Sequence, residues 1–258
     1  MPEQLQSGHM GRLYRVLNRR AGTFRLAVQQ ARREGGRTAA VREIGALLTN
    51  LAAWPAFRWY ERRHDERLRV VTGADAGAWS RPAHGPEAGI HGDGVAYSPT
   101  PLHLLRSLLR RLPIDRPADY AFVDLGCGKG RTLFVAAERG FRPVVGVELD
   151  PRLADVARDN VRAFMSAAPG HDRPVSIVVC DASTYDFPAA PLVVYLFNAF
   201  GAGTLQAVVA NLRRSMAVTP RHVVVAYFNP VHRRVLDACP ELRLTATARH
   251  WAIYATTT

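Results

Sequence analysis

Four polar side chains stand where apolar runs of the sequence end. Asp124 begins a glycine-rich turn, and Glu148, Asp181 and Asn198 follow three later apolar runs. Carboxylates can bind ammonium, hydroxyl and exocyclic amine groups, and an amide can both donate and accept hydrogen bonds. Together these residue types could bind a ligand that carries several polar groups, and they could orient an amine beside it.

The glycine-rich turn has the sequence DLGCGKGR and spans residues 124–131. An apolar run over residues 120–123 precedes it, and residues 132–138 have helical character. An α/β protein presents backbone N–H groups to a small ligand where a tight glycine turn joins a strand to a helix. Lys129 in this turn is the only lysine of the chain, which has 33 arginines.

The elements around the turn alternate between strand and helix. The pattern predicts strands over residues 121–125, 144–148, 175–180, 192–197 and 223–228, and helices over residues 102–112, 131–139, 151–166, 202–215 and 231–238. Residues 242–246 and 250–256 alternate in polarity and predict a terminal antiparallel hairpin. The fold class is therefore α/β, a doubly wound, seven-stranded, mostly parallel sheet. Ligands bind such sheets at the carboxyl ends of the strands, where the four polar residues are expected.

A helical extension is predicted ahead of this domain. Apolar residues recur at helical spacing within residues 13–31 and 41–51, with Gly35 and Gly36 between them, and a short helix is indicated around residues 56–63. Residues 72–95 contain six glycines and predict a loop or lid. We expect residues 1–95 to form a helical extension with a lid loop, packed on a domain of residues 96–258.

Composition limits the function classes. The chain has 258 residues, 48% of them hydrophobic, and no apolar run approaches the roughly 20 residues that span a bilayer. The N-terminus lacks the pattern of a signal peptide, and the three cysteines form no C-x-x-C pair, so a cytoplasmic protein is predicted. The net charge of +12 is spread along the chain and does not favour a nucleic-acid partner. The nine histidines show no zinc-like spacing, and no metal is predicted.

The turn does not match a dinucleotide fingerprint. It reads G-x-G-x-G, whereas a dinucleotide fold places its third glycine later. Asp124 would be a poor neighbour for a diphosphate but suits a ligand with an ammonium group. S-adenosylmethionine carries an α-amino group, a sulfonium, a ribose and an adenine, and no phosphate. The acids at three strand ends predict this cofactor.

These segments resemble the class I S-adenosylmethionine-dependent methyltransferase family. The matching motifs are VDLGCGKGR, GVELD, CDA and YLFNAFG, within residues 97–258. The resemblance implies that Asp124 helps to hold the amino group, that Glu148 binds the ribose, and that Asp181 with the Ala182 backbone recognises adenine. The turn residues implied to shape the methionine pocket are Gly126, Gly128 and Gly130, and Cys127 between them is a further candidate cofactor contact.

Within that family the chain resembles a bacterial branch akin to the non-SET histone-lysine methyltransferases. That branch has a Tyr-x-Pro-Thr element, matched here by residues 97–100, so Tyr97 and Thr100 are candidate cofactor contacts. It also has an Asn-Pro-Phe-Gly-like turn after the fourth strand. Ala199 replaces the proline of that turn.

Asn198 is the candidate for orienting the methyl acceptor, because its amide oxygen can accept a hydrogen bond from a substrate amine. Phe200 could pack beside the methyl group, and Tyr227 could line the opposite side of the pocket. We expect N-methylation of an amine-bearing small molecule or a protein side chain. The alternatives are an RNA methyltransferase, an NAD-dependent oxidoreductase and a non-catalytic nucleic-acid-binding module. The sequence assigns no oligomeric state.

Overall fold

The computed structural model describes residues 55–73, 94, 97–167 and 174–257. The chain divides into two compact units, Met1–Tyr60 and Glu61–Thr258. The helices expected within residues 13–51, and most of the loop expected over residues 72–95, lie outside the described residues. A helix covers residues 55–68, so it extends beyond the expected 56–63.

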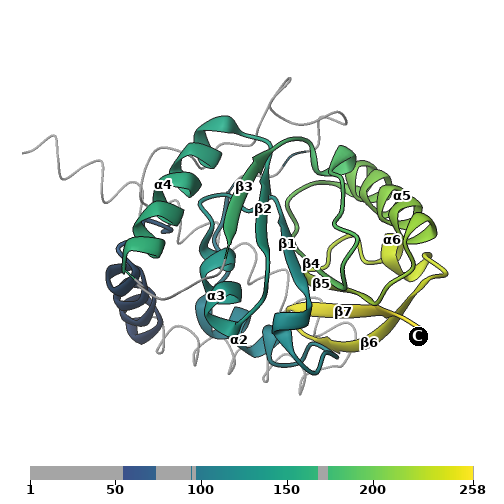
Figure 1. Ribbon diagram of the computed structural model, residues 1–258. Coiled ribbons are helices and arrows are strands. Elements are labelled where there is room, and N and C mark those ends of the chain that lie inside the picture. Colours follow the sequence, from purple (N-terminus) through teal and green to yellow (C-terminus); the bar gives the residue numbers. More distant parts are fainter. Residues whose placement is uncertain (1–54, 74–93, 95–96, 168–173, 258) are drawn as a thin grey trace, which may run out of the picture. The chain divides into compact units, whose positions relative to one another are not determined.

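The second unit contains a seven-stranded sheet with the strand order β3-β2-β1-β4-β5-β7-β6 (Figure 1). The first five strands are β1 (Ala121–Leu125), β2 (Val144–Glu148), β3 (Val175–Val179), β4 (Leu192–Phe197) and β5 (Val223–Phe228), and they pair in parallel. β6 (Leu242–Ala248) and β7 (Trp251–Thr256) form the terminal hairpin, in which β7 pairs antiparallel with both β5 and β6. The predicted fold class is confirmed.

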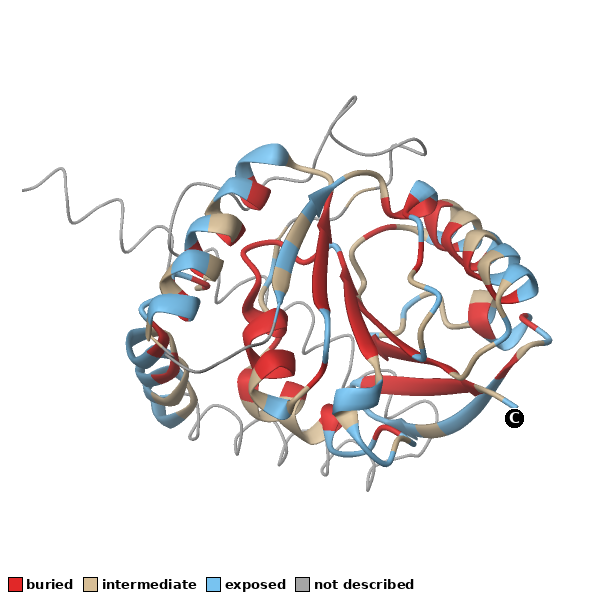
Figure 2. Cartoon of the chain, viewed as in Figure 1, coloured by how far each residue is buried: buried red, intermediate tan, exposed pale blue. Residues whose placement is uncertain are grey.

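Burial explains why the Val-rich runs are strands. β1, β2 and β5 are buried along their whole length, as expected for parallel strands that are covered on both faces (Figure 2). β3 is one of the two edge strands, and its side chains are exposed or half-buried. Successive side chains of β1 point to opposite faces of the sheet. Ala121, Val123 and Leu125 pack with α5 (Ala202–Val218), whereas the Phe122 ring lies 5.0 Å from the ring of Phe141, centre to centre.

Helices cover both faces of this sheet. α2 (Leu102–Leu109), α3 (Arg131–Arg139) and α4 (Pro151–Ala167) lie on one side, and α5 and α6 (Arg234–Asp237) lie on the other (Figure 1). The α2 helix is shorter than predicted, and α6 begins three residues later than predicted. Short 3-10 turns cover Pro117–Asp119 and Ala182–Thr184.

The strand order reverses beside β1. The chain passes from β1 to β2 and β3 on one side, and then returns to β4 and β5 on the other side. Loops that leave the carboxyl ends of β1 and β4 therefore diverge, which opens a crevice between them. This crevice is where the polar residues of the sequence were expected to meet.

Candidate cofactor and acceptor site

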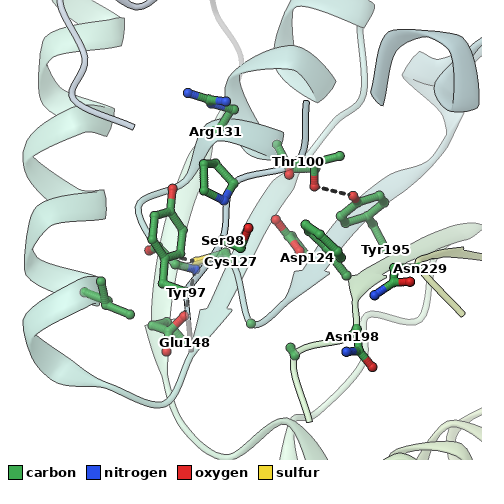
Figure 3. Close-up of a pocket in the computed structure, with 17 residues that line it drawn as sticks. Tyr97, Ser98, Thr100, Asp124, Cys127, Arg131, Glu148, Tyr195, Asn198 and Asn229 are labelled. Atoms are coloured by element: carbon green, nitrogen blue, oxygen red, sulfur yellow. Dashed lines mark hydrogen bonds between the residues drawn. The ribbon is translucent and has the colours of Figure 1, made fainter. Parts of the chain in front are cut away.

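A cavity of about 300 Å³ lies at this crevice. It is lined by the segment that precedes α2, by the glycine turn, and by residues at the ends of β2, β4 and β5. Tyr97 and Glu148 lie at one end in Figure 3, Asp124 lies between, and Asn198 and Asn229 lie at the other end. The fold thus joins most of the predicted cofactor residues and the predicted acceptor residue, Asn198, in one pocket.

The backbone N–H groups of the glycine turn are used within the protein. Gly126 and Cys127 both donate to the Val147 carbonyl, at 2.8 and 3.0 Å. Gly128 donates to the Glu148 carboxylate at 2.7 Å, and Gly130 donates to the Cys127 carbonyl at 2.9 Å. A turn that binds a diphosphate needs such N–H groups for the ligand. Their use here favours a phosphate-free ligand.

The turn is also closely packed, which explains two of its glycines. Gly126 has φ of +79°, and a Cβ there would overlap the Ala199 side chain. Gly128 has φ of +55°, and a Cβ there would overlap the Tyr97 ring. Only glycine fits these two positions without strain. Ala199, the residue that replaces the proline of the related turn, thus contacts the glycine turn directly.

Asp124 lies at the end of β1 and is 2% exposed. Burial raises the pKa of Asp124 to about 8, and the nearby charge of Glu148 acts in the same direction, whereas a hydrogen bond with Thr132 opposes them. Burial disfavours the ionised form because water no longer solvates it. A buried carboxyl of this kind gains a great deal from a cationic group of a ligand.

Glu148 is held by the backbone. One carboxylate oxygen accepts from Gly128 N at 2.7 Å, and the other accepts from Asp150 N at 3.0 Å. Burial raises the pKa of Glu148, although these N–H groups oppose the shift. Each carboxylate oxygen has a second lone pair, so Glu148 can still accept hydrogen bonds from the hydroxyls of a ligand.

The predicted Tyr-x-Pro-Thr element lines the same pocket. The Tyr97 hydroxyl donates to the Thr72 carbonyl at 2.7 Å, so the ring and not the hydroxyl faces the glycine turn. Thr100 is 3% exposed, and its hydroxyl lies 2.6 Å from the Tyr195 hydroxyl, within hydrogen-bonding distance. These contacts place the segment as one wall of the pocket.

The acceptor end contains two asparagines with left-handed backbones. Asn198 follows β4 with φ of +41°, and Asn229 follows β5 with φ of +49°. The Asn198 side-chain oxygen is buried and has no hydrogen-bond partner. A buried acceptor without a partner is costly, and strained or unsatisfied groups concentrate at functional sites. Asn198 is therefore suited to accept a hydrogen bond from a bound molecule.

Five predicted site residues do not line this cavity. Gly130 caps the N-terminus of α3, and Phe200 is buried beside β4. Tyr227 is fully buried, and its hydroxyl accepts from the His232 backbone at 3.3 Å. The Asp181 carboxylate accepts from the Ser183 backbone at 2.8 Å, and Ala182 packs into the core.

Sequence reasoning missed several lining residues, which are Arg131, Thr132, Leu153, Tyr195, Phe197 and Asn229. Asn229 was detectable because it ends the fifth strand, as Asn198 ends the fourth. Arg131 was not detectable. It is 4% exposed, and its ion pairs with Glu61 and Asp65, at 3.2 and 3.5 Å, depend on tertiary contacts.

Metal and membrane features were searched in the described part of the chain. No group of three or more His, Cys, Asp or Glu side chains there could hold a metal ion. None of the described helices is long and apolar enough to cross a membrane. The three cysteines are free thiols.

Comparison with known proteins supports the chemistry of this site. Residues 122–218 match the family model described as a methyltransferase domain. No curated protein matches the sequence. The chain therefore contains a methyltransferase domain.

Three solved structures are similar at low identity. The PH0226 protein from Pyrococcus horikoshii OT3 is 16% identical, with 60% of this chain and 89% of that chain covered and a TM-score of 0.44. An RNA methyltransferase from Salinibacter ruber, in complex with S-adenosyl-L-homocysteine, is 24% identical, with 62% and 93% covered and a TM-score of 0.41. A ribosomal protein L11 methylase from Lactobacillus delbrueckii subsp. bulgaricus is 14% identical, with 60% and 76% covered and a TM-score of 0.41.

Proposed function

We propose that this enzyme methylates a nitrogen atom of an amine-bearing small molecule or protein side chain, and that Asn198 orients that amine. The buried Asn198 oxygen without a hydrogen-bond partner carries this proposal. An amine N–H that donates to this oxygen would be held in one orientation, with its lone pair turned toward the cofactor. Transfer to an amine needs alignment more than acid–base catalysis, and alignment alone can supply a large part of the rate.

The residues of the pocket fit the proposed cofactor. S-adenosylmethionine supplies a methyl group that its sulfonium already activates for transfer. Asp124 provides a buried carboxylate for the ammonium group, and Glu148 provides acceptors for the ribose hydroxyls. The Tyr97 ring against Gly128, and Ala199 against Gly126, keep the walls of the pocket close to the glycine turn.

The adenine contact remains part of the proposal. Asp181 follows β3, the third parallel strand, as the family motif requires, but it is not among the residues that line the cavity. Its carboxylate accepts from both the backbone and the hydroxyl of Ser183, at 2.8 and 2.6 Å. We propose that the Asp181 carboxylate also accepts a hydrogen bond from the exocyclic amine of adenine, beside the Ala182 backbone.

The branch assignment is also a proposal. Residues 97–100 form a wall of the pocket, as a Tyr-x-Pro-Thr element of the cofactor site would. The Asn-Ala-Phe-Gly turn keeps its asparagine in the pocket, with a left-handed backbone. Both features support a relationship to the non-SET histone-lysine methyltransferases, and they favour an amine acceptor over RNA.

A methyl-transfer screen would identify the acceptor. The full-length enzyme is incubated with radiolabelled S-adenosylmethionine and with lysate fractions that contain protein, small molecules or RNA. We expect label in the protein or small-molecule fraction. Label that ribonuclease releases would contradict the proposed acceptor class, and no label in any fraction, despite measured cofactor binding, would contradict the enzyme's proposed activity on amines.

Two variants of Asn198 distinguish a role of its side-chain amide from a role of its backbone in the turn. Asn198→Ala and Asn198→Gly both remove the side-chain oxygen, but glycine tolerates the positive φ. We expect both variants to lose acceptor turnover by about tenfold to a hundredfold, as for a lost hydrogen bond in a reacting complex, and to retain S-adenosylhomocysteine affinity. If Asn198→Gly keeps full activity, the residue serves the turn and not the acceptor.

A further inference from the structure

Lys129, the only lysine of the chain, lies in the glycine turn and is fully buried. Its ammonium group donates to the Gly73 carbonyl at 3.1 Å, and it lies 5.4 Å from the centre of the Tyr97 ring. A buried ammonium is costly unless hydrogen bonds and favourable charges surround it. A cation within about 6 Å of an aromatic face is attracted to that face.

Residues 70–73 are attached to the glycine turn at several further points. The Tyr97 hydroxyl donates to the Thr72 carbonyl at 2.7 Å. The Arg131 Nε donates to the Thr72 hydroxyl at 2.8 Å. Two of the three partners of Thr72, Tyr97 and Arg131, line the cavity, so the 70–73 segment is bonded to two walls of the cofactor pocket, while the third partner is Asp65.

Asn160 of α4 closes the same network from the other side. Its side chain accepts from Val71 N at 2.8 Å, and it donates to the Val71 carbonyl at 3.1 Å and to the Lys129 carbonyl at 2.9 Å. Asn160 is 4% exposed. One buried amide thus bonds the backbone of the 70–73 segment to the backbone of the glycine turn.

The Tyr97 ring transmits these bonds to the pocket. It occupies the space that a Cβ of Gly128 would need, so its position determines how closely that wall approaches the turn. The 70–73 segment fixes the ring through the hydroxyl, and Lys129 attracts it through its face. A shift of either contact would move a wall of the pocket.

We propose that Lys129 is a positioning residue for the cofactor: it bonds the 70–73 segment and the Tyr97 ring to the glycine turn, so that cofactor binding and attachment of this segment reinforce each other. This inference rests on the proposed cofactor pocket. By linkage, a ligand that binds best to the attached state must also stabilise that state. The burial of Lys129 therefore depends on whether the cofactor site is filled.

Because the chain has a single lysine, Lys129 carries the only side-chain amine that an amine-acylating reagent can modify. Lys129 reacts only when a local opening exposes it. Full-length protein is labelled with and without saturating S-adenosylhomocysteine, and acylation of Lys129 is followed by mass spectrometry. The α-amino group of the same chain serves as the internal reference. We expect the ligand to slow acylation of Lys129 about tenfold or more, equivalent to about 1.4 kcal/mol of coupling.

Two variants distinguish local coupling from general stability. Thr72→Val keeps the shape of the side chain but removes the hydroxyl that accepts from Arg131 and donates to Asp65. We therefore expect faster acylation and weaker S-adenosylhomocysteine binding. Arg139→Met is the matched control, because Arg139 also donates from α3 to a backbone carbonyl, that of Leu109 at 3.2 Å, at the far end of the helix. We expect its acylation rate to stay within about twofold of the wild type.

The outcomes separate this inference from the proposed function. If the wild-type protein fails to bind S-adenosylhomocysteine by calorimetry, the proposed pocket is wrong. If it binds the ligand while Lys129 reacts equally fast with and without it, the pocket stands and the coupling is wrong. Equal acceleration in Thr72→Val and Arg139→Met would also overturn the coupling, because any loss of stability would then expose Lys129.

Discussion

At the end of β1, Asp124 is 2% exposed, and burial raises its pKa to about 8. The ordinary value is 3.8, so the folded state holds a proton that the unfolded chain releases. The free energy of unfolding must therefore fall as pH rises from about 4 to about 8, and it levels off above that range. In its proposed role Asp124 binds the cofactor in its charged form, and that form destabilises the cofactor-free protein.

Asp124→Asn should remove this pH-dependent loss of stability and weaken cofactor binding. We expect the stability of the variant, measured relative to that of the wild type, to be higher at pH 8 than at pH 5. The difference is at most about 1.4 kcal/mol for each pH unit between these two values. Its affinity for S-adenosylhomocysteine should fall at least about tenfold, as for a lost hydrogen bond to a charged group. Urea unfolding at both pH values and calorimetry test this. A variant that loses stability as well as affinity at pH 8 would show that the carboxylate supports the turn itself.

At the scale of elements, the glycine turn and the segment before α2 depend on each other for space. Gly128 and Gly140 both have left-handed backbones, with φ of +55° and +108°. A Cβ at Gly128 would overlap the Tyr97 ring, whereas a Cβ at Gly140 would meet nothing within 4 Å. Both positions therefore need a left-handed backbone, but only Gly128 is closely packed.

Gly140→Ala measures the backbone cost alone, and Gly128→Ala adds the clash. We expect Gly140→Ala to lower the free energy of unfolding by about 1–2 kcal/mol. Gly128→Ala should cost about 1–3 kcal/mol more, as for overpacking, and should weaken S-adenosylhomocysteine binding. Equal stability losses in urea unfolding would mean that the Tyr97 ring moves freely, and would argue against the close contact of the two elements.

The helix over residues 55–68 is joined to α3 by a buried histidine. His64 is 5% exposed, and its ring nitrogens lie 3.5 Å from an Asp65 oxygen and 3.6 Å from a Glu138 oxygen. Burial alone would lower the pKa of His64, but these carboxylates outweigh burial and the nearby Arg106 charge, so the pKa is raised. Protonated His64 thus stabilises the contact between the two helices.

His64→Gln should remove this pH dependence. The raised pKa means that the stabilisation is complete below about pH 6.5, the ordinary value, and is lost as pH rises through the folded value. We therefore expect the wild type to exceed the variant in stability by more at pH 6 than at pH 8.5. His222→Gln is a control for which we expect the opposite dependence of stability on pH, because burial lowers the pKa of His222. The same trend in both variants would contradict the role of the His64 carboxylate neighbours.

At the scale of the molecule, the sequence predicted what local pattern determines. Val-rich runs are buried strands wherever they occur, and parallel strands bring their carboxyl ends to one edge, so Asp124, Glu148 and Asn198 meet. Side-chain direction beyond the strand was not predictable. Asp181 uses its carboxylate in a local turn with Ser183, and Tyr227 points into the core. Contacts between distant segments left no signal in the sequence.

The domain boundary at residue 96 stays a prediction, and these distant contacts suggest how to test it. The sequence predicts a domain of residues 96–258, whereas the compact unit begins at Glu61. Glu61 and Asp65 pair with Arg131, which is 4% exposed and lines the cofactor pocket. Gly73 accepts from the buried Lys129. A chain that starts at residue 96 would leave both cations buried without these partners.

Two truncated chains test the boundary. We expect residues 61–258 to fold and to bind S-adenosylhomocysteine with nearly full affinity. Residues 96–258 should lose about 3–5 kcal/mol of stability, the usual result of removing one side of a buried ion pair, and should bind the ligand weakly or fail to fold. Thermal melting with and without the ligand measures both effects. If residues 96–258 bind the ligand as tightly as the full chain, the pocket does not need residues 61–73, and the predicted boundary at residue 96 is the correct one.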